Sequence, residues 1–304
     1  MALRHPFYCA GSIPVTAPDA AFKNGQRFPH PVKGMRIALG LEYNGAAYTG
    51  WQTQPGGRTV QDTVEQAVRE IAGEPVRIVC AGRTDTGVHA RAQVAHFDTP
   101  AERPDSAWVK GVNTHLPPDI AVQWAVRVSA EFHARFSAEA RRYDYFLLNR
   151  PHRSALHAAS MGWFHVPLDL EAMREAAAHL IGEHDFSAFR SSECQAKSPV
   201  RTLTRLGIGR SGDVIQFTFE ANAFLHHMVR NMVGSLVYVG KGNRASAWIG
   251  ELLASRTRAL AAPTFSPCGL YLSQIRYDAR WALPPFPPAA LPSCTPETLA
   301  QLST

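Results

Sequence analysis

The chain has 304 residues, 45% hydrophobic and 18% charged, which is the composition of a globular protein with a sizeable core in one or two domains. Its net charge is +6, and arginine supplies 26 of the 31 basic side chains; guanidinium groups suit a phosphate-bearing partner, although a GC-rich genome has the same effect on composition. The five cysteines form no CxxC pair and no stretch reaches the ~20 apolar residues of a membrane span, so disulfide frameworks, zinc knuckles and membrane proteins are excluded and a reducing, cytoplasmic setting is expected.

Residues 1–33 are rich in Pro, Gly and Ala without periodicity, so we expect an extended tail and no signal peptide there. Residues 34–138 form a first half, with strands expected over 35–45, 76–80, 93–99 and 120–128 and helices over 59–73 and 106–116. In the first helix Val60 and Val64 share one face, and Thr59 is its expected N-cap. This order is that of a split βαβ unit.

A similar order returns in residues 139–281, the second half. Strands are expected over 140–149, 202–210, 213–222 and 269–277, and helices over 169–182, 224–240 and 246–255. Two such halves predict an α+β fold with helices over one face of a mixed sheet. Their open edges allow them to join into one larger sheet, with a cleft where they meet. Residues 282–304 hold six prolines and are expected to form a second extended tail.

The loop AGRTDTGVHA follows the second expected strand and holds a single carboxylate, Asp85, between Arg83 and His89. Gly82 and Gly87 allow a tight turn or a close approach to a ligand. Three interpretations are open. Asp85 caps the turn through backbone amides, or stays ionised beside a guanidinium as a nucleophile must, or binds a metal with His89. The metal site would need further ligands, and none stands at a telling spacing.

The stretch FHARFSAEARRYDYF, residues 132–146, interleaves aromatic side chains with arginines. Bases stack on aromatic faces and arginines neutralise phosphates, so the mixture is typical of a segment that binds nucleic acid. It is also typical of an ordinary strand, in which Tyr143 and Tyr145 share one face. Arg142, Asp144 and Phe146 then share the other face.

The expected helix over 224–240 is apolar along most of its length but contains Arg230. On a helical wheel this arginine falls with His227, Asn231 and Gly234, which is consistent with a plain polar face. Alternatively, Arg230 lies beneath the cleft and needs a carboxylate partner, because an unpaired buried charge is costly. Asp85 is the candidate partner.

Three motifs, AGRTDTGVHA, ARRYDYF and NAFLHHMVRNMVGSL, together with EYNGAAYTGWQ and GLYL, resemble the tRNA pseudouridine synthases of the TruA family. The resemblance runs from about Met35 to Tyr277, and a set of motifs in this order is more specific than any one of them. It implies the pseudouridine synthase fold, a mixed and mostly antiparallel sheet from two RRM-like halves with a central cleft. It also implies a homodimer, without metal or cofactor, that isomerises uridine on the 3′ side of the tRNA anticodon stem-loop (tRNA positions 38–40).

The resemblance also implies roles for single residues. Asp85 matches the catalytic aspartate, Tyr143 the tyrosine that packs on the target base, and Arg230 the basic residue paired with the aspartate. Arg83 matches an arginine of RNA contact and base flipping. The segment at 193–197 is less basic than the family pattern. The full set of implied RNA contacts is Arg83, Arg103, Phe132, His133, Ala134, Arg135, Phe136, Arg141, Arg142, Glu193, Cys194, Gln195, Ala196 and Lys197.

Two other classes of function are compatible with parts of the sequence. A non-catalytic RNA-binding protein could be built from two RRM-like halves, but neither half carries the aromatic RNP1 pattern with which such sheets stack bases. A metal-dependent phosphoesterase could use Asp85, His89 and the pair His226 and His227, and a chelator would abolish its activity.

Overall fold

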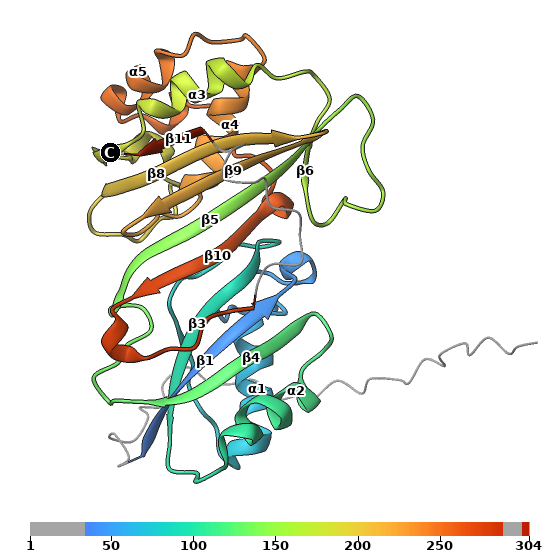
Figure 1. Ribbon diagram of the computed structural model, residues 1–304, viewed down its shortest axis with the longest axis vertical. Coiled ribbons are helices and arrows are strands. Elements are labelled where there is room, and N and C mark those ends of the chain that lie inside the picture. Colours follow the sequence, from blue (N-terminus) through green and yellow to red (C-terminus); the bar gives the residue numbers. More distant parts are fainter. Residues whose placement is uncertain (1–33, 288–299, 304) are drawn as a thin grey trace, which may run out of the picture. The chain divides into compact units, whose positions relative to one another are not determined.

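A computed structural model describes residues 34–287 and 300–303 (Figure 1). The strands of the first half are β1 (Met35–Tyr43), β2 (Val79–Cys80), β3 (His89–Thr99) and β4 (Ile120–Val128). Those that follow are β5 (Ala138–Asn149), β6 (Gly162–Phe164), β7 (Gly182–Asp185), β8 (Val200–Ser211), β9 (Val214–Ala221), β10 (Leu270–Tyr277) and β11 (Ala300–Ser303). The expected tail over 1–33 lies outside the described residues.

The helices are α1 (Val60–Ala72), α2 (Val112–His115), α3 (Leu170–Ala178), α4 (Met228–Gly240) and α5 (Trp248–Ser255). A π-helical turn, Ala107–Gly111, leads into α2. Short 3₁₀ turns occupy Gly45–Ala47, Ser187–Phe189, Arg258–Leu260, Pro267–Gly269 and Ala279–Trp281. Each described helix is too short or too polar to cross a membrane.

All the strands belong to one sheet, in the order β11-β8-β9-β5-β10-β3-β1-β4, with β2, β6 and β7 pairing beside this path. Strands of the two halves meet where β10 runs parallel to β3, in the pairs Tyr271 with His89 and Leu272 with Ala90. Most other pairs, including β10 with β5 and β3 with β1, are antiparallel. The prediction of one mixed, mostly antiparallel sheet is therefore confirmed.

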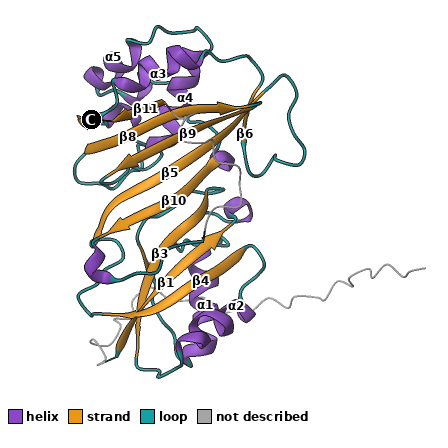
Figure 2. Cartoon of the chain, viewed as in Figure 1, coloured by secondary structure: helices purple, strands orange, loops and turns teal. Residues whose placement is uncertain are grey.

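The helices cover one face of this sheet (Figure 2). One large core cluster contains buried side chains from each of α1 to α5. From β1 it takes Ile37, Leu39 and Leu41, whereas Ala38 belongs to a smaller cluster on the opposite face, as the alternation of side chains along a strand requires. The prediction of helices over one face is confirmed.

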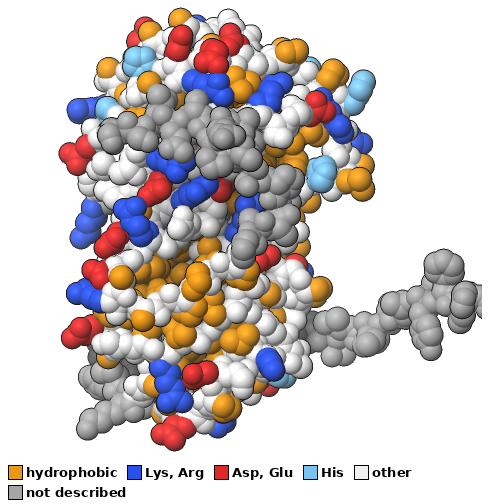
Figure 3. Space-filling model, viewed as in Figure 1, with side chains coloured by type: hydrophobic (Ala, Val, Ile, Leu, Met, Phe, Trp, Pro, Cys, Tyr) orange, Lys and Arg blue, Asp and Glu red, His pale blue; other side chains and the backbone are white. Residues whose placement is uncertain are grey.

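The opposite face carries the smaller cluster, and hydrophobic side chains gather there over β1, β3 and β4 (Figure 3). Trp124 of β4 packs against Phe286, and Phe132 packs against Trp281, with ring centroids 5.4 and 5.3 Å apart. Residues 300–303 add β11 to the edge of the sheet beside β8. Within the expected tail, Phe286 and residues 300–303 thus contact the sheet, and the division of the chain into halves and tails stays a prediction.

Candidate active site

The loop that carries Asp85 joins β2 to β3, and its backbone is held in place from several sides. The carbonyl oxygen of Thr84 accepts a hydrogen bond from the Trp51 amide at 3.0 Å, and its hydroxyl lies 2.8 Å from the Tyr43 hydroxyl. Gly87 has φ +75°, a conformation that glycine adopts at little cost. A backbone fixed in this way gives the Asp85 side chain a defined starting direction.

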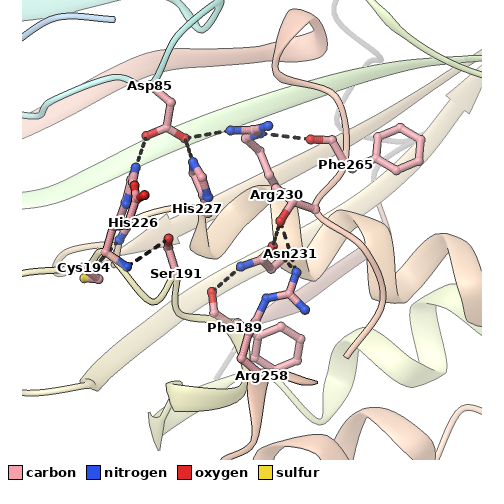
Figure 4. Close-up of polar contacts among 12 residues, drawn as sticks. Asp85, Phe189, Ser191, Cys194, His226, His227, Arg230, Asn231, Arg258 and Phe265 are labelled. Carbon is pink, nitrogen blue, oxygen red and sulfur yellow. Dashed lines mark hydrogen bonds and ion pairs between the residues drawn. The ribbon is translucent and has the colours of Figure 1, made fainter. Parts of the chain in front are cut away.

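The carboxylate of Asp85 points toward the second half, at the start of α4 (Figure 4). One oxygen, Oδ2, lies 3.1 Å from Nη1 of Arg230 and 3.5 Å from Nε2 of His227. The other, Oδ1, lies 3.4 Å from Nε2 of His226. The side chain is 19% exposed. The interpretation of Asp85 as a turn cap is therefore wrong, since its partners are side chains far along the chain.

This environment keeps Asp85 ionised. Burial alone would raise the pKa of the carboxylate. The hydrogen bond from His226 and the charges of His227 and Arg230 outweigh burial, so the pKa of Asp85 lies below its ordinary value of 3.8. A carboxylate that stays unprotonated can act as a nucleophile or a base at neutral pH.

The pKa values of the two histidines are shifted in opposite directions. The hydrogen bond to Asp85 raises the pKa of His226 above 6.5 against the effect of burial, whereas burial lowers the pKa of His227. Their ring centroids are only 4.0 Å apart, so protonating both would place like charges in contact. His226 is accordingly the ring that carries a proton beside Asp85 more readily.

From the sequence, His226 and His227 were grouped with Asp85 only as metal ligands of a phosphoesterase, not as charge partners of the carboxylate. The helix expected over 224–240 begins only at Met228, because His227 has φ +63° and ψ +2°. This left-handed conformation is costly for a residue other than glycine and is typical of functional sites. The signal in the sequence was the pair of histidines immediately before an apolar helix.

Arg230 reaches Asp85 from the first turn of α4, where its side chain is 13% exposed. Its Nε donates to the Phe265 carbonyl oxygen at 2.9 Å, and the Phe265 amide donates to the Arg230 carbonyl at 3.2 Å. The segment around Phe265 can approach α4 because Gly234 has no side chain: a Cβ there would lie 2.4 Å from the Pro263 carbonyl oxygen. The interpretation of Arg230 as a buried arginine that needs a carboxylate matches this geometry, and the plain polar face does not.

Tyr143 lies on β5, beneath the loop of Asp85, and is 8% exposed. Its ring meets Phe224 edge to face, with centroids 5.1 Å apart, and its hydroxyl would be 3.6 Å from a Cβ on Gly82. Burial, followed by the negative charge of Asp85, raises the pKa of Tyr143 well above 10. The phenol therefore keeps its proton at neutral pH, and its predicted contact with a base remains a prediction.

The predicted RNA-binding arginines of the centre differ in their surroundings. Arg83 is exposed, and within residues 34–287 its side chain makes no hydrogen bond or ion pair. Arg141, in contrast, donates to four backbone carbonyls, among them that of Ala81 at 3.2 Å, so it also braces the loop of Asp85. Arg142 contacts Asp144 at 3.4 Å. Arg83 is thus the one of these three with a free guanidinium in the described structure.

The segment 132–136 contributes to the smaller core cluster and to the surface. Phe132 and Ala134 are fully buried in this cluster, and their predicted contact with RNA stays a prediction. Phe136 is 76% exposed, with the Arg135 guanidinium 5.6 Å from its ring centroid and the tilted ring of His133 at 4.3 Å. In this segment, the side chains of His133, Arg135 and Phe136 are accessible for the predicted contact with RNA.

The other predicted RNA contacts lie on different sides of the site. Residues 193–197 border it, since the Cys194 sulfur accepts from the His226 amide at 3.5 Å. Arg103 donates to the Ile71 carbonyl at the end of α1. It follows β3, and 11 residues of strand at ~3.3 Å each separate that end from Asp85, so the structure does not bring Arg103 to the carboxylate.

A metal ion has a possible ligand set here, which contains three of the four residues named in the phosphoesterase hypothesis. His89 is 2% exposed and lies between the Gly45 amide and the Cys268 carbonyl, away from Asp85. Among the described residues, Asp85, His226 and His227 offer ligand atoms within 4.8 Å of one another. Arg230 contacts the same carboxylate, and its charge disfavours a cation at this point.

Comparison with known proteins gives a consistent family. A family model described as tRNA pseudouridine synthase matches residues 41–137 and 176–278, which contain Asp85, His226 and Arg230 but not Tyr143. A chain from the crystal structure of a Cbf5-Nop10-Gar1 complex is 10% identical, with a TM-score of 0.36 over 78% of this chain and 48% of that one. This similarity is too low to support a conclusion.

Curated relatives are much more similar. A tRNA pseudouridine synthase A of Dechloromonas aromatica is 59% identical over 250 residues, which cover 82% of this chain and 95% of the relative. Enzymes of the same name from Burkholderia mallei and Burkholderia thailandensis are 59% and 58% identical over 251 residues, covering 83% of this chain and 93% of each relative.

Proposed function

This chain belongs to the tRNA pseudouridine synthase family, and from that premise we propose that it converts uridine to pseudouridine on the 3′ side of the tRNA anticodon stem-loop. Asp85 is the catalytic carboxylate in this proposal. The observation that carries it is the ionised, largely buried Asp85, held where the halves meet by Arg230 and the histidine pair. Ionisable groups with pKa values shifted by specific charge partners cluster at functional sites.

The reaction needs a base to leave its stack before any bond changes. Extruding a uridine costs a few kcal/mol, and a guanidinium such as that of the exposed Arg83 can occupy the space or hold the displaced backbone. The uracil then rests on the ring of Tyr143, beneath the loop of Asp85. Both roles follow from the family resemblance and from the positions of these side chains.

Three routes of chemistry begin from an ionised Asp85: attack on the ribose C1′, addition to the uracil ring, or removal of a ribose proton. In each, the bond between C1′ and N1 breaks, the uracil turns, and a bond forms between C1′ and C5. N1 gains a proton and C5 loses one, so the isomerisation balances without a redox step. All three need the unprotonated carboxylate that His226 and Arg230 maintain.

Release of tritium tests the proposal most directly. Replacing the C5 hydrogen with carbon releases it to solvent, so tRNA labelled with tritium at C5 of uridine should lose its label to water in the presence of this protein. Release should stop when the uridines on the 3′ side of the anticodon arm are changed to cytidine. If release continued after this change, the protein would still be an isomerase, but the proposed position of the substrate uridine would be refuted.

The same assay separates the other classes of function. A non-catalytic RNA-binding protein would release no tritium. A phosphoesterase that used a metal on Asp85, His226 and His227 would cut the RNA and would lose its activity in excess EDTA. Tritium released from intact tRNA in EDTA would exclude both alternatives.

A further inference from the structure

A cavity of about 510 Å³ adjoins the carboxylate site within the second half of the chain. Arginines dominate its lining, which includes Arg190, Arg256 and Arg258 together with Ser191, Ser192 and His227. His227 belongs to both places, because its Nε2 lies 3.5 Å from Asp85. The cavity is therefore separated from the carboxylate by a single imidazole ring.

The positive charge of this cavity is mostly unbalanced. Arg190 donates to the carbonyl oxygens of Cys194 and Ala196, which are neutral acceptors. Of the three arginines, Arg256 alone forms an ion pair with a described residue, Asp185 at 3.4 Å, and its side chain is 69% exposed. Three guanidinium groups thus face one carboxylate, and the surplus charge favours an anion in the cavity.

A second arginine of the cavity, Arg258, is held in a fixed direction. Nη2 of Arg258 donates to Oδ1 of Asn231 and to Oγ1 of Thr264, both at 3.1 Å. Asn231 is itself fully buried, and its amide donates to the Phe189 carbonyl at 2.8 Å (Figure 4). A guanidinium oriented in this way is prepared to receive a ligand, since little side-chain freedom is lost on binding.

We propose that this cavity binds a backbone phosphate of the RNA substrate beside the target uridine. The inference rests on the proposed function, because a uridine that reacts at Asp85 brings the phosphates of its own strand next to His227. Guanidinium forks and serine hydroxyls are the donors that phosphate oxygens accept from best. The phosphate would anchor the strand while the base turns within the site, so the cavity contributes to RNA affinity more than to the bond-breaking step.

The test measures tRNA binding in the Asp85→Asn background, so that it does not depend on turnover. Two further changes make the cavity less positive: Arg256→Gln removes a charge, and Ser192→Asp adds an opposite one at an exposed position. We expect each to weaken tRNA binding roughly tenfold at moderate salt. Each should also make the slope of log affinity against log salt shallower by about 0.7 to 0.9, the value for one phosphate contact.

Arg127→Gln is the matched control. Arg127 lies on the edge strand β4, is 54% exposed and contacts Asp105 at 3.5 Å, so it loses the same charge and the same kind of ion pair as Arg256→Gln. Its effect on affinity should be much smaller. Equal effects of Arg127→Gln and Arg256→Gln would overturn the proposal, because the loss would then reflect overall charge.

Two other results would also overturn it. One is unchanged tRNA affinity and salt slope in both Arg256→Gln and Ser192→Asp. The second is binding of inorganic phosphate to the wild-type cavity while both variants keep the wild-type tRNA affinity; this result would assign the cavity to a free anion. Failure of the proposed function is seen separately: it shows as absent tritium release from the wild type, whatever the cavity variants do to binding.

Discussion

At the scale of single residues, the chemistry depends on Asp85. Asp85→Asn keeps the shape of the side chain and removes its charge, so tritium release should fall by at least about 10³-fold. Affinity for tRNA should change little, because phosphate contacts supply most of it. Filter binding alongside the release assay measures both quantities. A variant that kept a few per cent of wild-type turnover would show that the catalytic group lies elsewhere.

Arg230 helps to keep that carboxylate charged, together with the larger contributions of His226 and His227. Arg230→Leu removes a positive charge 3.1 Å from Asp85, so the pKa of Asp85 should rise. Because catalysis needs the ionised form, the acid limb of the pH-rate profile should move to higher pH, and turnover should fall by about tenfold or more. Arg230→Lys keeps the charge and should keep part of the rate. The profile is recorded between about pH 4 and 8. An acid limb that stays in place in Arg230→Leu would refute this role.

At the scale of elements, α4 begins at a strained residue. His227 is held at φ +63°, which costs about 1 to 2 kcal/mol for a residue with a Cβ. His227→Gly should therefore unfold at the same temperature as the wild type or a higher one, while losing the contact with Asp85 and part of the activity. His227→Val should unfold at a lower temperature, because β-branching makes this conformation worse. Thermal unfolding followed by circular dichroism distinguishes the two variants. Equal unfolding midpoints of His227→Gly and His227→Val would show that no strain is stored here.

The close approach of the segment 263–265 to α4 makes a second prediction. Gly234→Ala would gain about 1 kcal/mol of helix propensity, but its Cβ would meet the backbone oxygen of Pro263 at 2.4 Å. We expect the clash to win, with a net loss of about 1 to 3 kcal/mol in the free energy of unfolding and a lower activity as Phe265 moves away from Arg230. Gly250→Ala in α5 is the control, since its Cβ would meet only the His179 side chain, at 3.3 Å. A stabilised Gly234→Ala would contradict this account.

Elements whose signals are local were predicted well from the sequence. Helix α1 begins after Thr59, which accepts from the Asp62 amide at 3.2 Å, and ends at Gly73 in the left-handed conformation, as its pattern of apolar and capping residues indicated. Strand β2 is shorter than expected because side chains of α1 hold Ile78 instead: Glu65 accepts from its amide and Gln61 donates to its carbonyl. Such tertiary contacts leave no periodic trace in the sequence.

The candidate site shows the same division. Asp85 and Arg230 were brought together by the argument that a buried charge needs a partner, and the structure places them in contact. His226 and His227 were grouped with Asp85 only as metal ligands; their role as charge partners was not predicted, because it depends on one residue leaving the helical conformation just before α4. The burial of Phe132 was likewise hidden, since it depends on Tyr277 and Trp281, far along the chain. RRM-like character of the two halves, and the RNA contacts, stay predictions.

At the scale of the whole molecule, we expect a homodimer, as the family resemblance implies. Light scattering at micromolar concentration should give twice the chain mass of 33.3 kDa. The reason is geometric: a long tRNA arm can be gripped by the basic surface of one subunit and modified in the site of the other. A measured mass equal to that of one chain would refute the expectation.

Strand β10 is the last strand of the second half, yet it stands in the middle of the sheet between β3 and β5. Proteins emerge from the ribosome from the N-terminus onward, so the neighbours on both sides of this position are synthesised long before the strand that joins them. Until residue 277 has emerged, the halves that carry Asp85 and Arg230 have no β10 to bring them into register. We therefore expect the nascent protein to become active only after residue 277 has been synthesised.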